Sequence, residues 1–286
     1  MKVFRRRVFT AGAVLFALAL GIALGAGPLS GPAEVLPGLP DRAQSNAAVG
    51  SFESAFVDRT SADLLNDRLN GHAVVVLSVD AAEPDEIKRI RGALKDAGAR
   101  ITGTSTLTSK LLDPANRQFA EGVARQAASE VAGVTKGPDS YRRIGAALAR
   151  ALINKSKGAP DATGQTIWSA FEEGGFVSGD APRTYADSAV IVVSGERSAA
   201  ASTVLAGLAQ ALDAAAQGTV VAGPSSSSLA GGAVAEVRAV DGGSTVDVTE
   251  SPAGSLLVAL ALKRDADGKP GAWGTPRSED GALPAP

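Results

Sequence analysis

The sequence predicts an α/β fold with a Rossmann-like, doubly wound and mostly parallel sheet, preceded by one N-terminal membrane helix. The runs 72–79 and 188–193 are apolar and rich in β-branched residues, which is typical of strands buried on both faces. Segments with helical periodicity lie between and after these runs, and such alternation favours a parallel sheet. The predicted membrane helix is the uncharged run from Val8 to Gly27.

The strand at 72–79 opens a strand–helix–strand unit. Pro84 suits the first position of a helix, because its φ is already helical and its missing N–H would have no partner there. Asp85 and Glu86 complement the helix dipole, and Gly98 ends the helix. Residues 100–107 are predicted to form the second strand, which would be reached by a right-handed crossover.

A single extracytoplasmic α/β domain is expected over 51–265, followed by a flexible, polar tail over 266–286. A helix is expected over 51–70, before the first strand. The remaining elements expected are helices at 116–131, 141–154, 165–171, 198–217 and 255–263, strands at 188–193 and 219–222, and two weaker strands at 233–240 and 244–248.

Residues 1–27 predict a membrane anchor. The run Val8–Gly27 carries no charge and would span about 30 Å as a helix, the thickness of a bilayer core. Lys2 and the arginines at 5–7 place the N-terminus in the cytoplasm and the domain outside the membrane. A cleaved signal peptide is the alternative, with a small-x-small site at Ala23-Leu24-Gly25.

Small residues recur on one face of this helix, where a second helix could approach closely. They are Ala13, Ala17, Gly21 and Gly25. The alternative explanation is that the leader is simply rich in alanine and glycine. Residues 28–50 contain four prolines, which predicts a spacer rather than a helix. The expected partners are therefore the membrane and either a second copy or another envelope protein.

The composition excludes several kinds of site. The chain has no cysteine, one histidine and one methionine, so a disulfide, a thiolate metal site and a cysteine nucleophile are absent. The net charge is −2, and no basic cluster follows the N-terminus, which argues against a nucleic-acid partner. His72 begins a strand without an obvious acid partner, so no catalytic triad is expected. No catalytic residue, metal ligand or cofactor is assigned.

Candidate binding residues follow the predicted strands, because doubly wound sheets bind ligands beyond the carboxyl ends of their strands. They are Asp80, Ser194, Gly195, Gly223 and Ser225. Backbone amides of the serine-rich loop at 223–232 could hold an anion. Neither a P-loop nor a G-x-G-x-x-G motif is present, and a surface loop is the alternative. The acids at 80, 83, 85 and 86 could hold a cation, although a helix start explains all but Asp80.

Several short segments in a set order carry a resemblance to a known family. They are a basic start followed by 18–25, the strand 74–76, the helix from Asp85 to Gly98, and the segments 106–108, 189–195, 218–223 and 268–274. Over most of the chain, this order resembles the actinobacterial copper transport outer-membrane family (MctB-like). Members typically have a coiled coil between membrane segment and domain. Here the proline-rich spacer is expected to replace it.

The resemblance implies a non-enzymatic cell-envelope protein of copper efflux and copper homeostasis, and it adds the outer membrane to the expected locations. The alternative is a membrane-anchored envelope module that binds protein partners to regulate cell separation or peptidoglycan hydrolysis. Copper would be a transported ion, because Cu(I) prefers cysteine or methionine and Cu(II) prefers imidazole, which this chain nearly lacks. A hydrolase or a nucleotide-binding enzyme would rest on fold analogy alone.

Overall fold

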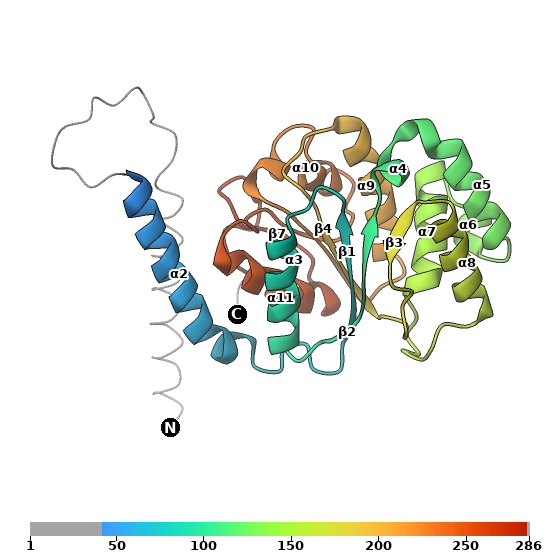
Figure 1. Ribbon diagram of the computed structural model, residues 1–286. Coiled ribbons are helices and arrows are strands. Elements are labelled where there is room, and N and C mark those ends of the chain that lie inside the picture. Colours follow the sequence, from blue (N-terminus) through green and yellow to red (C-terminus); the bar gives the residue numbers. More distant parts are fainter. Residues whose placement is uncertain (1–41, 285–286) are drawn as a thin grey trace. The chain divides into compact units, whose positions relative to one another are not determined.

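The computed structural model describes residues 42–284 (Figure 1). The predicted membrane helix, its face of small residues and the spacer up to residue 41 lie outside the described residues. Within the described part of the chain, no helix has both the length and the apolarity needed to cross a membrane. Helix α2 (Arg42–Leu65) includes residues 42–50, so the prediction of a spacer is wrong there. The last proline of the spacer is Pro40, and nothing after it interrupts the helix.

A seven-stranded sheet is the centre of the α/β unit, which begins at Thr60. The strand order is β3-β2-β1-β4-β5-β6-β7, and all neighbours are parallel except β2 and β3. Every residue of β1 (Ala73–Val79) and β4 (Ser188–Val192) is buried, which confirms the predicted central strands. The other strands are β2 (Arg100–Leu107), β3 (Val177–Gly179), β5 (Gly218–Ala222), β6 (Ser244–Val246) and β7 (Ala272–Trp273).

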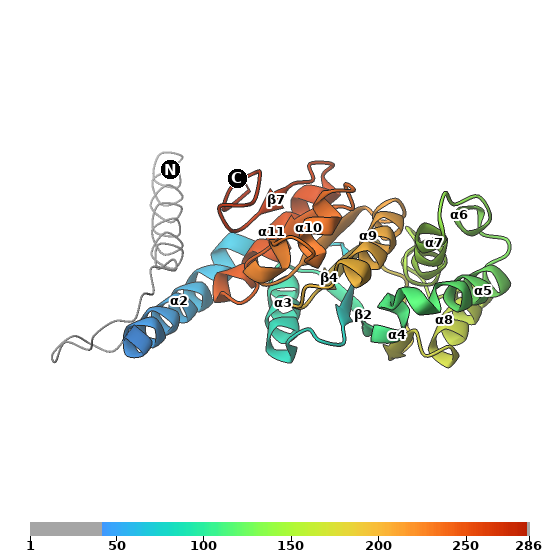
Figure 2. The ribbon, with the colours of Figure 1, turned by 90° about the horizontal axis from the view of Figure 1, so that it is seen from above.

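Helices cover both faces of the sheet. The chain leaves β1 and β4 in opposite directions, so right-handed crossovers place α3 (Pro84–Asp96) and α9 (Ala199–Asp213) on opposite faces. Helix α3 packs against α11 (Pro252–Ala266), and α9 packs against α7 (Ser140–Leu152) and α10 (Ala233–Arg238). Most of the helices between β2 and β4 gather beside β3 (Figures 1 and 2). Those described are α4 (Ser109–Leu112), α5 (Arg117–Ala127), α6 (Ala132–Thr135), α7 (Ser140–Leu152) and α8 (Ala162–Glu173), with the short 3₁₀ turn η1 (Pro114–Asn116).

Two predicted elements differ from the structure. The weak strand at 233–240 is instead α10 (Ala233–Arg238), whose buried Val234 and Val237 are spaced as on a helix face. The single helix at 116–131 is broken, because Ala128 leaves helical geometry at φ −130° and the chain turns before α6. The turn buries Ala128 and Val134, so packing outweighs the helix propensity of the segment.

The segment predicted as a flexible tail is part of the fold. Helix α11 continues to Ala266, and β7 then pairs in parallel with β6. Trp273 is 3% exposed and lies under the guanidinium of Arg264, 6.0 Å from the ring centre. A large aromatic side chain gains enough from burial to order a polar, glycine-rich segment around it. The predicted tail is therefore wrong for residues 266–281.

Candidate functional site

The topology reverses between β1 and β4. After β1 the chain crosses to β2, and after β4 it crosses to β5, so the two connections separate and leave space at the carboxyl edge. Asp80 follows β1 and Ser194 follows β4, and both line a cavity of about 460 Å³ at this point. We call it the switch-point cleft. Two of the five predicted binding residues are thus brought together by the fold.

The switch-point cleft has an apolar interior and a hydroxyl-rich border. Apolar surface comes from the ends of β1 and β4, from α4 and from α9: Val79, Val193, Leu112 and Leu205. Hydroxyl groups come from Ser109, Ser194, Ser198 and Ser202. A cavity of this size, with an apolar interior and a few polar groups, matches the usual form of a small-molecule site.

Several polar residues around the cleft hold helix ends in place. The carboxylate of Asp80 accepts a hydrogen bond from the backbone N–H of Ser109 at 2.6 Å, at the start of α4. Asp113 accepts from Ala115 N at 2.9 Å, and Ser198 caps α9 by accepting from Ala201 N at 3.4 Å. These hydrogen bonds to backbone N–H groups hold the starts of α4, η1 and α9 in place around the cleft.

The ionisable groups that line the cleft are all acidic. They are Asp80, Asp113 and Glu196, and among the described residues no lysine, arginine or histidine lines it. A phosphate or a nucleotide needs positive charge or free backbone amides. No cationic side chain among the described residues lines the cleft, and Ser198 already accepts from the N–H of Ala201 at the start of α9, so the lining is less suited to a phosphate than the usual sites of doubly wound sheets.

Gly195, Gly223 and Ser225 lie at the same edge of the sheet but do not line the cleft. The carbonyl of Gly195 accepts from Ser226 Oγ at 3.2 Å, and a Cβ on Gly223 would meet Val193 and Ser227. Both glycines therefore allow close packing between the two loops. The N–H of Ser225 donates to both carboxylate oxygens of Glu250, at 3.0 and 3.1 Å. The amide of Ser225, at the start of the loop expected to bind an anion, is thus occupied by the chain's own carboxylate.

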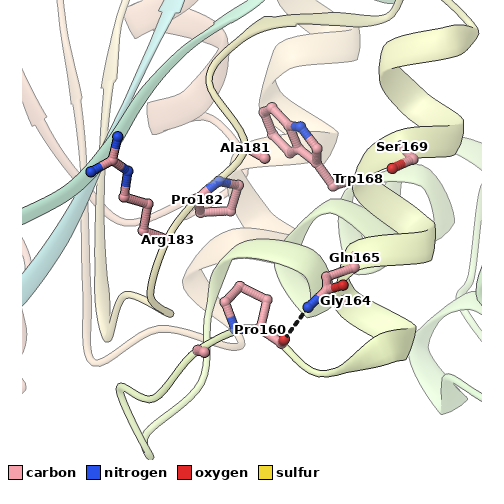
Figure 3. Close-up of a pocket in the computed structure, with 9 residues that line it drawn as sticks. Pro160, Gly164, Gln165, Trp168, Ser169, Ala181, Pro182 and Arg183 are labelled. Carbon is pink, nitrogen blue, oxygen red and sulfur yellow. Dashed lines mark hydrogen bonds between the residues drawn. The ribbon is translucent and has the colours of Figure 1, made fainter.

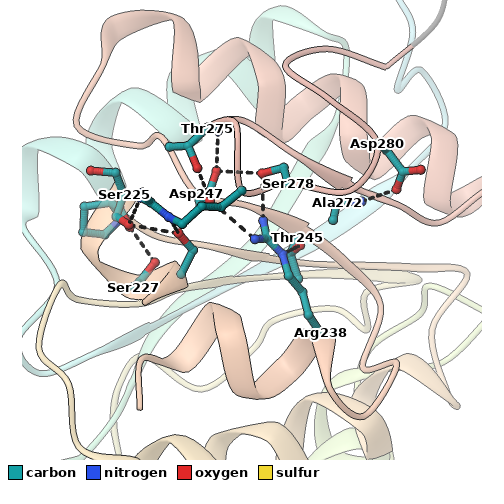
Figure 4. A network of polar contacts seen from close by, with 12 residues as sticks. Ser225, Ser227, Arg238, Thr245, Asp247, Ala272, Thr275, Ser278 and Asp280 are labelled. Carbon is teal, nitrogen blue, oxygen red and sulfur yellow. Dashed lines mark hydrogen bonds and ion pairs between the residues drawn. The ribbon is translucent and has the colours of Figure 1, made fainter. Parts of the chain in front are cut away.

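A buried polar network lies beyond this loop, around Asp247 (Figure 4). Its Oδ1 accepts from Thr275 N at 2.7 Å and from Ser278 Oγ at 3.0 Å. Its Oδ2 accepts from Thr275 Oγ1 at 2.7 Å and pairs with Arg238 at 3.4 Å. Arg238 also donates to Thr245 Oγ1 at 2.8 Å. The network fastens the C-terminal segment to β6 and has the form of a structural lock.

The acids considered for a cation site do not converge. Thr249 Oγ1 donates to the carboxylate of Glu86 at 3.0 Å, whereas Asp80 turns to α4. Burial raises the pKa of Glu86, and the hydrogen bond from Thr249 offsets this only in part. Throughout residues 42–284, no three His, Cys, Asp or Glu side chains are grouped so that they could hold a metal ion.

His72 does have an acid partner, which the sequence did not suggest. Its Nδ1 lies 3.6 Å from Oδ1 of Asp187, which is fully buried just before β4, and Lys157 Nζ lies 2.5 Å from Oδ2. Burial by itself raises the pKa of Asp187, but the nearby His72, the ion pair with Lys157 and the hydrogen bond from Ser188 outweigh it and bring the pKa to about 2. The group lies at the amino edge of the sheet, away from the switch-point cleft, and holds the start of β4 against β1.

A second cavity, of about 500 Å³, lies between α8 and the loop at 180–183 (Figure 3). Pro160, Trp168, Pro182 and Arg183 are among its lining residues. Arg100, at the start of β2, donates to Thr184 at 2.6 Å, so this cavity lies toward the amino ends of the strands. The indole N–H of Trp168 is buried and finds no acceptor in the described part of the chain. Because that atom has almost no exposed surface, it does not serve as a donor inside the cavity.

Five polar residues of the switch-point cleft were not among the candidate binding residues: Ser109, Asp113, Glu196, Ser198 and Ser202. A signal was available for two of them. Ser198 precedes a long alanine-rich helix, as an N-cap does, and Ser109 follows the end of the second predicted strand. Asp113 and Glu196 carry no periodic signal, because they lie in turns whose direction is set by the packing of α4 on α9.

Comparison with known proteins adds a family. Residues 1–284 match the family model described as "Copper transport outer membrane protein, MctB". The copper transporter MctB of Mycobacterium tuberculosis is 28% identical over 288 residues, which cover 90% of this chain and 91% of that protein. The copper transporter MctB of Mycobacterium leprae is 26% identical over 297 residues, with the same coverage of both chains.

Proposed function

The chain belongs to the family of the copper transport outer membrane protein MctB, and on this premise we propose that it is a non-enzymatic cell-envelope component of copper efflux and copper homeostasis. The observation that carries the proposal is the extent of the match. It runs over residues 1–284 and so includes both the N-terminal segment and the whole α/β unit. The resemblance noted from short segments of the sequence rests on the same parts of the chain.

Copper is proposed as the cargo of the pathway rather than as a resident ion of this protein. Tight copper sites use several cysteine, methionine or imidazole ligands. This chain has no cysteine, and its one histidine, His72, is paired with Asp187. Its one methionine, Met1, precedes the uncharged run 8–27 and so is separated along the chain from His72. These features support a contribution through protein or small-ligand contacts rather than through direct copper ligation.

We further propose that Val8–Gly27 anchors the protein as a single membrane helix, with the N-terminus in the cytoplasm and the α/β unit outside. The four cations before residue 8 support this orientation. The face formed by Ala13, Ala17, Gly21 and Gly25 would allow a second copy or an envelope partner to pack closely. N-terminal sequencing of the mature protein should recover residues 2–7. A mature start near Ala26 would contradict the anchor.

Deletion of the gene tests the proposed function. The deletion strain should become sensitive to copper but not to zinc, and expression of the full-length chain should restore growth. A strain that expresses residues 28–286 behind a cleavable secretion signal exports the domain without the proposed anchor. Its copper tolerance shows whether the domain alone is sufficient or whether the anchor is also required. Normal copper tolerance together with unseparated cells would contradict the copper role and favour the alternative function, regulation of cell separation.

Calorimetry on the full-length chain tests whether copper is bound directly. Binding no tighter than roughly micromolar is expected, about −8 kcal/mol, because carboxylates and backbone oxygens hold copper weakly. His72→Gln should leave both the calorimetric trace and the growth of the complemented strain unchanged. A single tight site that disappears in His72→Gln would restore direct copper handling by the domain.

A further inference from the structure

We propose that the switch-point cleft binds a small organic cation, an ammonium group attached to an apolar body. The fold provides the first reason. The cleft lies where the connections from β1 and β4 separate, which is where doubly wound sheets bind their ligands. Its volume of about 460 Å³ lies within the range of small-molecule sites.

The walls define the body of the ligand. Val79 ends β1, Val193 directly follows β4, and Leu205 extends from the buried side of α9. These side chains present a mainly apolar surface, so a ligand gains free energy by burying carbon atoms against it. Serine hydroxyls at the border add donors and acceptors for a polar head group. Ser194 and Ser198 lie in the connection from β4 to α9, and Ser109 begins α4 after β2.

The charges define the head group. Asp80 and Asp113 each use one carboxylate oxygen for a backbone N–H, which leaves the other oxygen without a hydrogen bond in the described residues. The side chain of Glu196 has neither a hydrogen bond nor an ion pair with any described residue, and its neighbour Arg197 does not line the cleft. All three carboxylates are exposed to solvent, and a cleft lined by one sign of charge attracts ligands of the opposite sign. An ammonium group provides that charge, and a phosphate or carboxylate would add to the repulsion.

Inorganic cations fit the cleft less well. A resident zinc or calcium ion has three or more protein ligands that converge at about 2.0–2.6 Å. No three carboxylates or imidazoles of residues 42–284 are grouped in this way. Charges that are spread around a cavity suit a ligand with its own volume, which can bring one ammonium group near a carboxylate while its body fills the interior.

Three probes that share a six-carbon chain and differ in the charge of their head group test the proposal: hexylamine, 1-hexanol and hexanoate. Each is titrated calorimetrically into the full-length chain in non-ionic detergent, and the heat of titration into empty micelles is subtracted. Hexylamine should bind at least about tenfold more tightly than hexanoate, with 1-hexanol between them. Equal binding of the amine and the acid would overturn the proposal. So would the absence of saturable hexylamine binding up to about 10 mM.

Two matched pairs of variants locate the binding. Glu196→Gln should weaken hexylamine about tenfold, whereas Glu173→Gln, an exposed acid at the end of α8, should leave binding unchanged. Ala201→Leu should fill the cleft and abolish binding, and Thr203→Leu, on the exposed face of the same helix, should retain it. Full binding by Ala201→Leu, or equal losses in both glutamate variants, would place the site elsewhere. If Ala201→Leu lowers the unfolding midpoint, the glutamate pair decides.

Discussion

The carboxyl edge of the sheet differs between its two halves. Over β2, β1 and β4 it is open, and carboxylates around the switch-point cleft retain oxygens without a partner in the described residues. Over β5, β6 and β7 it is closed, because Glu250 fills the serine-rich loop and Asp247 fastens the C-terminal segment. Arg277 adds to the closure by donating to the carbonyl of Ser225 at 2.9 Å.

The difference shows how one topology can yield both a site and a lock. The loops that follow parallel strands lie at a common edge of the sheet. Whether the polar groups of a loop can bind a ligand depends on whether other segments of the chain already form hydrogen bonds with them. In the closed half, residues after α11 return to the sheet and supply the partners. In the open half, the segment at 231–233 returns to pair with Arg197 and to line the cleft, but it supplies no partner to Asp80, Asp113 or Glu196. Polar groups that are completely partnered contribute to stability, and those left unpartnered are available for recognition.

The largest expected effect concerns Asp247, at the centre of the closed half. Asp247→Ala leaves Arg238 and the N–H of Thr275 buried without their acceptor. The free energy of unfolding should fall by about 3–5 kcal/mol, as for other broken buried ion pairs. Urea unfolding followed by tryptophan fluorescence measures it. Asp267→Ala is the control, because Asp267 forms an exposed pair with Lys263 that contributes less than about 1 kcal/mol. A similarly small loss for Asp247→Ala would contradict the lock.

Gly274 gives a smaller effect in the same network. Its φ is +131°, and a Cβ there would collide with the Asp247 carboxylate. Gly274→Ala should cost about 2–3 kcal/mol, from backbone strain together with the displaced carboxylate. Gly281→Ala isolates the strain, because Gly281 also has positive φ, at +88°, but has open space around its Cβ position. Equal losses in the two variants would show that the carboxylate moves freely and that the network is loose.

Asp213, the last residue of α9, lies near the start of β5 and provides a test that depends on pH. Burial and the nearby carboxylate of Asp265 raise the pKa of Asp213 from 3.8 to about 6, against a smaller opposing effect of Thr219. Because the folded-state pKa lies above the unfolded value, the protonated carboxyl stabilises the fold below pH 4, and this stability is lost as the pH rises through 6. Asp213→Asn should therefore raise the free energy of unfolding at pH 7.5 by about 1–2 kcal/mol, after allowance for solvent screening.

A pH series of urea midpoints checks the sign. The advantage of Asp213→Asn over the wild-type chain should shrink as the pH falls from 7 to 4. Asp187 should behave in the opposite way, because its pKa of about 2 lies below the unfolded value of 3.8 and its contribution is lost only as the pH falls from 4 through 2. An Asp213→Asn advantage that is constant with pH would contradict the raised pKa.

The smallest effect is expected in the open half. Ser194→Ala removes a hydroxyl that accepts one hydrogen bond, from Glu196 N at 3.3 Å, in a half-exposed loop. The free energy of unfolding should change by less than about 0.5 kcal/mol. Chemical denaturation beside Asp247→Ala provides the contrast. A loss above about 2 kcal/mol would show that Ser194 belongs to a structural network and that the two halves differ less than the geometry indicates.

The local signals of the sequence were sufficient for much of the fold. Apolar, β-branched runs predicted β1 and β4, because a strand covered on both faces needs no polar residue. Pro84 and the acids after it predicted the start of α3. The meeting of Asp80 and Ser194 followed from the parallel sheet, since the carboxyl ends of neighbouring strands share an edge. Each of these inferences depends on composition or on spacing within a few residues.

Only the tertiary structure decided which half of the edge is open. Ser225 and Glu250 are 25 residues apart, and Thr275 and Asp247 are 28 apart, so no local periodicity connects them. The same holds for Asp187, which holds Ala73 N across 114 residues, and for Trp273, whose burial turns a glycine-rich segment into a strand. The sequence by itself determined where the central strands β1, β4 and β5 end and their loops begin. Whether a loop amide or carboxylate is occupied depends on segments distant along the chain, because their contacts form only when the complete core brings them together.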